Sequence, residues 1–148
     1  FISSTMWTER TGFAAAIATL ESMKKNNVQK LNVKNGRYFK KRILSECKKI
    51  NFDIDITGSE SMPAIKFRYP DSNKIQTYFT QEMLSIGYLA GSKIVFSLAH
   101  NERIIDNYIR DSIAVYKKIL QYIEHGKPIP LLGPEKHKTF KRLTGNKK

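Results

Sequence analysis

Residues 52–69 read FDIDITGSESMPAIKFRY, which is two runs of alternating apolar and polar residues separated by a short polar loop. Every second residue is apolar in residues 52–57 and again in residues 64–69, a period that is typical of half-buried β-strands. Gly58 and Ser59 end the first run. Because the loop is short, the sequence predicts that the two strands pair in antiparallel order.

Apolar spacings of three and four residues on both sides of this strand pair predict helices. The further expected elements are helices over residues 12–25, 33–50, 72–86 and 102–124, and a short third strand over residues 94–97. Asn26–Asn27 separate the first two helices, Asn101 caps the last one, and His125–Gly126 end it. We therefore expect an α+β fold in which a small antiparallel sheet is covered by helices.

One face of each expected helix is apolar, and these faces predict the core. The residues expected to face inward are Ala16, Leu20 and Met23; Phe39, Ile43, Cys47 and Ile50; Ile75, Phe79, Met83 and Ile86; and Ile105, Ile109, Ser112, Ile119 and Ile123. On the last helix, Asp106 and Arg110 have the spacing of an ion pair between successive turns.

The composition indicates one domain, because 41% of the 148 residues are hydrophobic and can form one core. We expect this domain to comprise residues 1–126, followed by a basic C-terminal extension over residues 127–148. No apolar run approaches the roughly 20 residues needed to cross a bilayer, so we expect no membrane segment. The chain begins at Phe1 rather than at a methionine, which suggests a piece of a longer protein.

The single cysteine, Cys47, can form no internal disulfide and falls on the apolar face of an expected helix. We interpret it as a buried residue of the core rather than as a reactive thiol. A reducing, cytoplasmic setting fits this cysteine usage.

The formal net charge of +13 raises the question of an anionic partner. The cations concentrate in residues 24–49 and 136–148. We favour a solvated helix face and a basic end over a nucleic-acid partner, because the aromatic residues fall on expected core faces and no helix-turn-helix is recognisable. A stand-alone basic module that binds nucleic acid is the alternative, and salt-dependent binding would identify it.

Self-contained catalytic groupings are missing from the sequence, which has no Walker-type loop, paired-cysteine metal site or close histidine pair. We expect no metal site and no catalytic residue in this chain. His100 precedes the last helix, and we interpret it as holding the strand-to-helix turn, with acid or base duty as the alternative. Ser4 and Thr5 stand just ahead of an Ala-rich helix, where they bind a phosphate or act as ordinary capping residues.

Three stretches share a further pattern. They are SSTMWTERTGFAAAIATLE at residues 3–21, FTQEMLSIGYL at residues 79–89 and FSLAHNE at residues 96–102. In this order and spacing they resemble class III aminotransferases that depend on pyridoxal 5'-phosphate (PLP), of the glutamate-1-semialdehyde aminomutase kind. The resemblance reaches from about Ser3 to Glu124.

This resemblance implies the C-terminal small domain of a fold-type I PLP-dependent transferase, which moves an amino group on a small amino or keto substrate. It leaves transaminase and mutase activity equally open. The family threonine at the position of Thr5, here beside Ser4, binds the PLP phosphate of the partner subunit in a homodimer. The Schiff-base lysine lies upstream in a large PLP-binding domain, so this chain alone is expected to be inactive.

The family's usual turn after that threonine is replaced here by Trp-Thr-Glu-Arg at residues 7–10, which suggests an altered pocket. The substrate-side candidates are Trp7, Glu9, Arg10 and His100. An apolar patch, exposed where the missing large domain would pack, is also expected.

Overall fold

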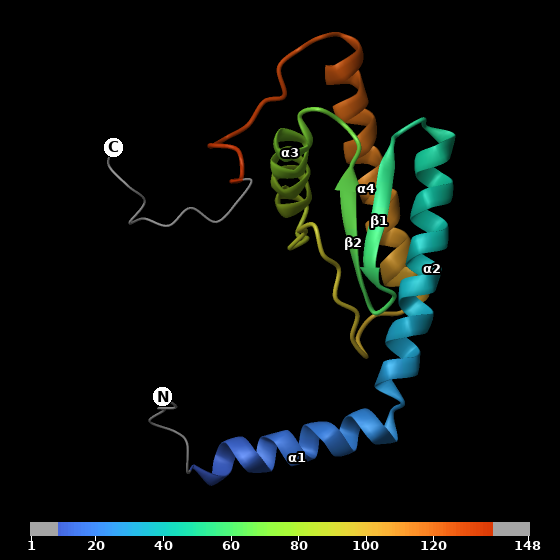
Figure 1. The fold of residues 1–148 in the computed structure, drawn as a ribbon, viewed down its shortest axis with the longest axis vertical. Coiled ribbons are helices and arrows are strands. Elements are labelled where there is room, and N and C mark those ends of the chain that lie inside the picture. The colour runs from blue at the N-terminus through green and yellow to red at the C-terminus, as the bar shows by residue number, and fades with distance from the viewer. Residues whose placement is uncertain (1–8, 138–148) are drawn as a thin grey trace, which may run out of the picture.

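The computed structural model of the chain describes residues 9–137 (Figure 1). Within these residues the elements are α1 (Arg10–Lys25), α2 (Val28–Lys49), β1 (Ile54–Ser59), β2 (Met62–Phe67), α3 (Ser72–Ser85) and α4 (Glu102–Glu124). The predicted α+β fold with a small antiparallel sheet is confirmed. None of the helices in this described part combines the length and apolar character that crossing a membrane requires.

The strand pair forms as predicted, with slightly different ends. Ile54 lies opposite Phe67 and Ser59 lies opposite Met62 in antiparallel register. β1 does not include Phe52, because the Phe52 N–H donates to the Cys47 carbonyl at 3.0 Å and is thereby tied to the end of α2. The sharp turn between helix and strand is made by Asn51, whose φ of 54° is in the left-handed region.

The predicted third strand over Ile94–Ser97 is wrong. Among the described residues, this part of the chain pairs with β2 only at a bridge between Lys93 and Ala64. The Ile65 N–H donates to the Ser92 carbonyl at 2.8 Å and the Ile94 N–H donates to the Pro63 carbonyl at 2.9 Å. Further along, the Ser97 N–H donates to Nδ1 of His100 at 3.0 Å. The chain therefore turns toward α4 instead of continuing the sheet.

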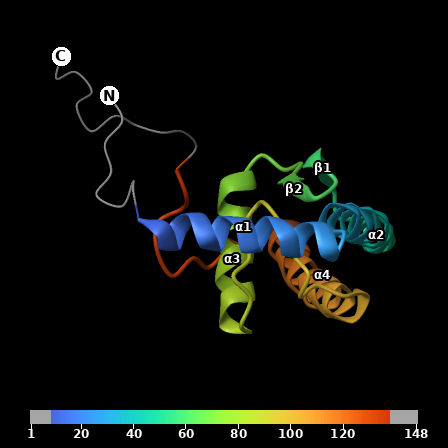
Figure 2. The same ribbon diagram turned by 90° about the horizontal axis from the view of Figure 1, so that it is seen from below.

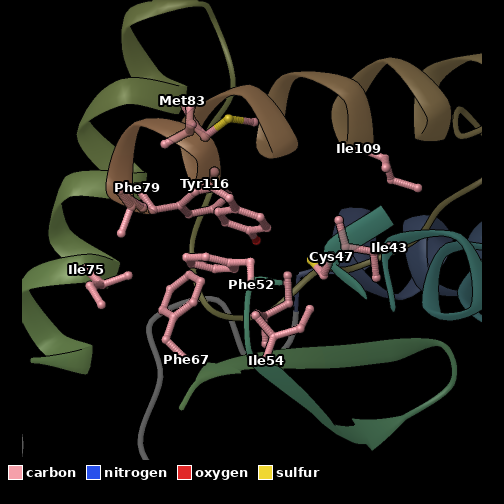
Figure 3. Close-up of a cluster of buried hydrophobic side chains, with 14 of the residues drawn as sticks. Ile43, Cys47, Phe52, Ile54, Phe67, Ile75, Phe79, Met83, Ile109 and Tyr116 are labelled. Atoms are coloured by element: carbon pink, nitrogen blue, oxygen red, sulfur yellow. The ribbon is translucent and has the colours of Figure 1, made fainter. Parts of the chain in front are cut away.

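The core forms where α2, α3 and α4 cover one face of the hairpin, and Tyr116 of α4 lies at its centre (Figure 3). The Tyr116 ring stacks on Phe52 with centroids 4.4 Å apart. It also meets Phe67 of β2 edge to face at 5.7 Å and Phe79 of α3 at 5.2 Å. Aromatic contacts of this kind add to the free energy of burial, so one ring links the hairpin to two helices.

The predicted core faces of α2, α3 and α4 are largely confirmed, including Cys47, which is 2% exposed, whereas the predicted inner face of α1 is wrong because none of Ala16, Leu20 and Met23 is buried. Ile86 and Ile123 are exceptions, since 53% and 41% of their surfaces are exposed. Ile86 follows the end of α3, and Gly87 with φ of 93° stops the helix there. In the last turn of α4, Tyr122 points inward instead of Ile123 and meets Tyr78 edge to face at 5.7 Å.

α2 begins at Val28, earlier than the predicted start at residue 33. Asn26 and Asn27 make the break as predicted; Asn27 has φ of 52°, and its carbonyl accepts the first helical hydrogen bond from Leu31 at 3.1 Å. The ion pair predicted between Asp106 and Arg110 is also wrong. α2 supplies the partners of Asp106, as described below, because contacts between helices outcompete a weak pair on one exposed helix face.

Asp106 of α4 joins that helix to α2. Its carboxylate accepts hydrogen bonds from the Tyr38 hydroxyl at 2.9 Å and from Nε of Arg42 at 3.3 Å. Arg110, which was the predicted partner, instead pairs with its neighbour Asp111 at 2.9 Å. The two longest helices are therefore fixed side by side by polar contacts as well as by apolar packing.

Replacing Asn101 with alanine is expected to destabilise the fold by about 1 kcal/mol. Oδ1 of Asn101 accepts the Ile104 N–H at 3.0 Å, so the side chain caps α4 as predicted. Urea unfolding of Asn101→Ala and of Asn101→Asp measures the effect, because aspartate keeps the cap. Equal stability of the alanine variant and the unchanged chain would contradict the assignment.

Residues 127–137 form no helix and lie along α3. The side chain of Gln81 donates to the Pro130 carbonyl at 3.2 Å and accepts the Leu132 N–H at 2.8 Å. The Lys136 N–H donates to the Thr77 hydroxyl at 3.0 Å. The domain boundary between residues 126 and 127 stays a prediction, and residues 138–148 lie outside the described part.

Candidate functional site

The predicted phosphate-binding residues Ser4 and Thr5, and the substrate-side candidate Trp7, lie outside the described residues. Of this region the structure describes only the start of α1. Glu9 is the N-cap of α1, and its side chain makes no capping hydrogen bond within the described residues. Arg10 is exposed and forms no ion pair with any other described residue. The N-terminal turn of a helix and the Arg10 guanidinium favour an anion, whereas the Glu9 carboxylate opposes one.

His100 holds the turn that leads into α4, as the structural interpretation predicted. Its Nδ1 accepts the Ser97 N–H at 3.0 Å and lies 2.9 Å from the Ser97 hydroxyl. Its carbonyl accepts from the side chain of Asn35 in α2 at 3.0 Å. Because Nδ1 accepts a hydrogen bond, Nε2 carries the proton in the neutral ring and is the nitrogen left for another partner.

His100 also lines a hollow of about 380 Å³ between α2, α4 and the loop that follows α3. The walls are mostly apolar and aromatic, and they include Phe39, Ile94, Phe96 and Tyr108. Leu89, which is 96% exposed, stands at its edge. Glu9 and Arg10 do not line it, so the structure does not bring the described substrate-side candidates together in one pocket.

α1 projects away from the helices that cover the hairpin (Figure 1). Within the described residues no side chain of α1 is buried, and Leu20, which was expected to face the core, is 65% exposed. Phe13 and Ile17 are 60% and 58% exposed and lie on the same side of the helix as Leu20. The expected exposed apolar patch is therefore present, and we call these three residues the α1 face.

The α1 face includes two residues that the sequence interpretation missed. Phe13, Ile17 and Leu20 are separated by four and three residues, which is a stronger apolar stripe than the predicted Ala16, Leu20 and Met23. Large side chains at this spacing were the available signal. A shallower hollow lies between the second half of α1 and the Ser97–Ala99 turn.

The described residues offer neither an activated thiol nor a cluster for a metal. Cys47 is buried, and burial raises the pKa of its thiol to about 12. The Tyr108 hydroxyl is enclosed in the same way, and its pKa is raised to about 12. No group of three His, Cys, Asp or Glu side chains in residues 9–137 could hold a metal ion.

Cys47 is expected to resist thiol reagents at pH 8 as long as the chain is folded. The pKa of about 12 leaves almost no thiolate at that pH, and burial excludes the reagent. The rate of labelling by a maleimide or a disulfide reagent is measured by mass spectrometry, in buffer and in concentrated urea. Rapid labelling in buffer at the rate seen in urea would show that Cys47 is accessible.

Comparison with solved structures relates this fold to part of a larger protein. The chain is similar to the FumI protein of Sphingopyxis sp. MTA144 in its PLP internal aldimine form, with a TM-score of 0.73 and 18% sequence identity. The match covers 84% of this chain and 30% of that chain. No protein-family model and no curated protein matches the sequence.

The likeness defines the class of fold, which is an α+β domain that FumI contains within a longer chain. Since the chain spans less than a third of that protein, the likeness concerns the domain and not the whole assembly. At this level of identity the fold is what the two proteins share.

Proposed function

We propose that the chain is the C-terminal small domain of a PLP-dependent aminotransferase or aminomutase of the glutamate-1-semialdehyde aminomutase kind. The observation that carries the proposal is the likeness to a PLP-containing protein over 84% of this chain and 30% of that one. The three resembling stretches in residues 3–21, 79–89 and 96–102 support the same family. The chain acts with a large domain that holds the Schiff-base lysine, and alone it is inactive.

PLP, when bound, supplies the electron sink for moving an amino group. The contribution of this chain is on the phosphate side, where Thr5 and Ser4 donate hydroxyl hydrogen bonds to the phosphate held by the partner subunit of a homodimer. The start of α1 fits an anion nearby, because its first-turn N–H groups lack a side-chain cap among the described residues. Arg10 adds a positive charge there.

The α1 face packs against the large domain in this proposal. Phe13, Ile17 and Leu20 are more than half exposed, and burying such side chains stabilises an interface by roughly 25 cal/mol for each Å² of apolar surface. The rim at Leu89 provides a second exposed apolar surface. In the complete enzyme of this proposal, the large domain covers the α1 face and the exposed surface at Leu89.

The substrate side draws on two separate places in this chain, the start of α1 with Trp7, Glu9 and Arg10, and the hollow lined by His100. Nε2 of His100 is the nitrogen left to donate a hydrogen bond, because Nδ1 is held by Ser97. Arg10 has the charge to bind the carboxylate of a small amino or keto substrate. The buried free thiol of Cys47 fits a reducing, cytoplasmic location.

Replacing Thr5 with valine in the complete enzyme tests the proposal. Removing one hydroxyl donor to a charged phosphate is expected to raise the apparent Kd for PLP about 10-fold to 100-fold. Thr11→Val is the matched control, because Thr11 is exposed in the first turn of α1. Equilibrium dialysis of the apoenzyme with PLP gives both constants.

Two results would count against the proposal in different ways. Equal PLP affinity of Thr5→Val and the unchanged enzyme would remove Thr5 from the phosphate site. A complete protein that binds no PLP at all would overturn the enzyme assignment itself.

A further inference from the structure

The outer face of α2 carries a straight row of cations. α2 contains eight Lys and Arg residues and one acidic residue, Glu46, so its net charge is +7. With 3.6 residues per turn, five of these cations fall within about 60° of the helix circumference. They are Lys30, Lys34, Arg37, Lys41 and Lys48, and we call them the α2 stripe.

The α2 stripe lies opposite the side of the helix that enters the core. Phe39, Ile43 and Cys47 point inward, whereas every member of the stripe is exposed. The stripe spans about 27 Å, given a rise of 1.5 Å per residue. A straight, exposed row of cations of this length presents a strong positive field to solvent.

Three members of the stripe, Lys30, Lys41 and Lys48, have no ion pair among the described residues. Lys34 lies 3.4 Å from Glu102, and Arg37 pairs with Glu60. In both pairs the basic side chain is 70% exposed, so these contacts are weak and a phosphate can displace them. The whole row is therefore available to an anion.

The N-terminal end of the stripe borders a hollow in the surface. A shallow hollow of about 450 Å³ is lined by Lys30, Lys34 and Arg37 together with Gln29 and Val33. Three cations and an amide around one hollow can donate several hydrogen bonds to the oxygens of a single phosphate group.

The chemistry of the stripe favours a duplex nucleic acid over the other polyanions. The row of cations carries no aromatic side chain, so it has no platform for stacking unpaired bases. It also lacks the large apolar residues that insert into a lipid surface, apart from Leu44 beside it, which is 37% exposed. About 27 Å corresponds to about eight base pairs of B-DNA, which carry one negative charge for about every 1.7 Å of the helix axis.

The surfaces that the proposed function uses do not include the stripe. In both views α2 lies at the end of α1 that is opposite its start (Figures 1 and 2). The α1 face and the start of α1, which the proposed function assigns to the large domain and to PLP, are elsewhere. An anion on α2 therefore does not compete with them.

In place of the solvated helix face that the sequence favoured, we infer that the α2 stripe binds the phosphate backbone of duplex DNA or RNA without reading its sequence. Lys30, Lys34 and Arg37 hold phosphates at the hollow, and Lys41 and Lys48 extend the contact along the helix. Such contacts release counterions, so the affinity falls steeply with salt, with a slope of about −0.9 in log Kobs against log salt for each phosphate contact on DNA. This inference is independent of the proposed enzyme function.

The test compares two triple variants of the 148-residue chain with the same loss of charge. Lys30, Lys41 and Lys48 are changed to glutamine in the first, which leaves the two ion pairs of the stripe intact. Lys66, Lys117 and Lys127 are changed to glutamine in the second, because they are exposed and lie outside α2. Fluorescence anisotropy with duplex DNA and duplex RNA of about 20 base pairs gives Kd over a series of salt concentrations.

The stripe variant is expected to bind at least about tenfold more weakly at low salt, with a salt slope shallower by about 2.7. The control variant keeps the slope of the unchanged chain, and matching unfolding midpoints confirm that both are folded. Equal losses in both variants would reduce the effect to net charge and overturn the inference. Binding to phosphatidylserine vesicles but not to duplexes, or no duplex binding at low salt, would overturn it as well.

Discussion

Replacing Gly36 with alanine is expected to destabilise the chain by about 3 kcal/mol or more, because α2 and the β1–β2 turn meet there. A Cβ at Gly36 would lie 1.5 Å from the Glu60 carbonyl oxygen and 2.6 Å from its carbon. Both atoms are backbone, so no side chain can rotate away. α2 cannot retreat either, because Tyr38 and Arg42 hold it to Asp106 of α4.

The sign of this effect distinguishes the close contact from helix propensity. Within a helix, alanine is favoured over glycine by about 1 kcal/mol, so propensity alone predicts a more stable variant. Gly12→Ala is the matched control, because a Cβ at Gly12 of α1 meets nothing within 4 Å. Urea unfolding followed by circular dichroism compares the two. A Gly36→Ala variant as stable as the unchanged chain would show that the turn does not approach α2 this closely.

Replacing Tyr116 with alanine is expected to cost about 3 to 5 kcal/mol, because it removes the ring on which Phe52, Phe67 and Phe79 converge. Tyr116→Phe is expected to be neutral or stabilising. The Tyr116 hydroxyl is buried and has no hydrogen-bond partner among the described residues, so removing it removes a desolvated group without breaking a contact.

The stability of the unchanged chain and that of Tyr116→Phe are also expected to depend differently on pH. Burial raises the pKa of the folded Tyr116 hydroxyl well above its ordinary value of 10.0. Above about pH 10 the unfolded chain loses this proton while the folded chain keeps it, so stability falls as pH rises. Unfolding measured from pH 8 to 11 should show a smaller decline for Tyr116→Phe. An identical decline in both proteins would contradict the buried position of the hydroxyl.

The sequence predicted those features that depend on local pattern. The hairpin follows from alternation around Gly58, and α4 was predicted with both ends correct because Asn101 caps it and Gly126 ends it. The buried faces of α2 and α3 follow from the spacing of apolar residues. Such signals lie within a few residues of one another, so they can be read without the fold.

Features that depend on distant partners were missed. The third strand ends after one bridge because His100 takes the Ser97 N–H, and Asp106 turns from Arg110 to Tyr38 and Arg42 of α2. The α1 face was missed for the same reason. The spacing of its apolar residues indicates a helix with a buried side, but it does not say which surface buries that side. Of the predicted site residues, the turn-holding hydrogen bond of His100 is confirmed, and the substrate-side and phosphate assignments remain predictions.

The most direct test of the central claim is to sequence the gene on the 5′ side of the codon for Phe1. The account predicts an open reading frame that continues upstream into a large α/β domain, with a lysine a few tens of residues before Thr5 for the Schiff base. A start codon next to Phe1, with no such domain in frame, would leave Thr5 without a cofactor-binding partner in its own chain and would contradict the account.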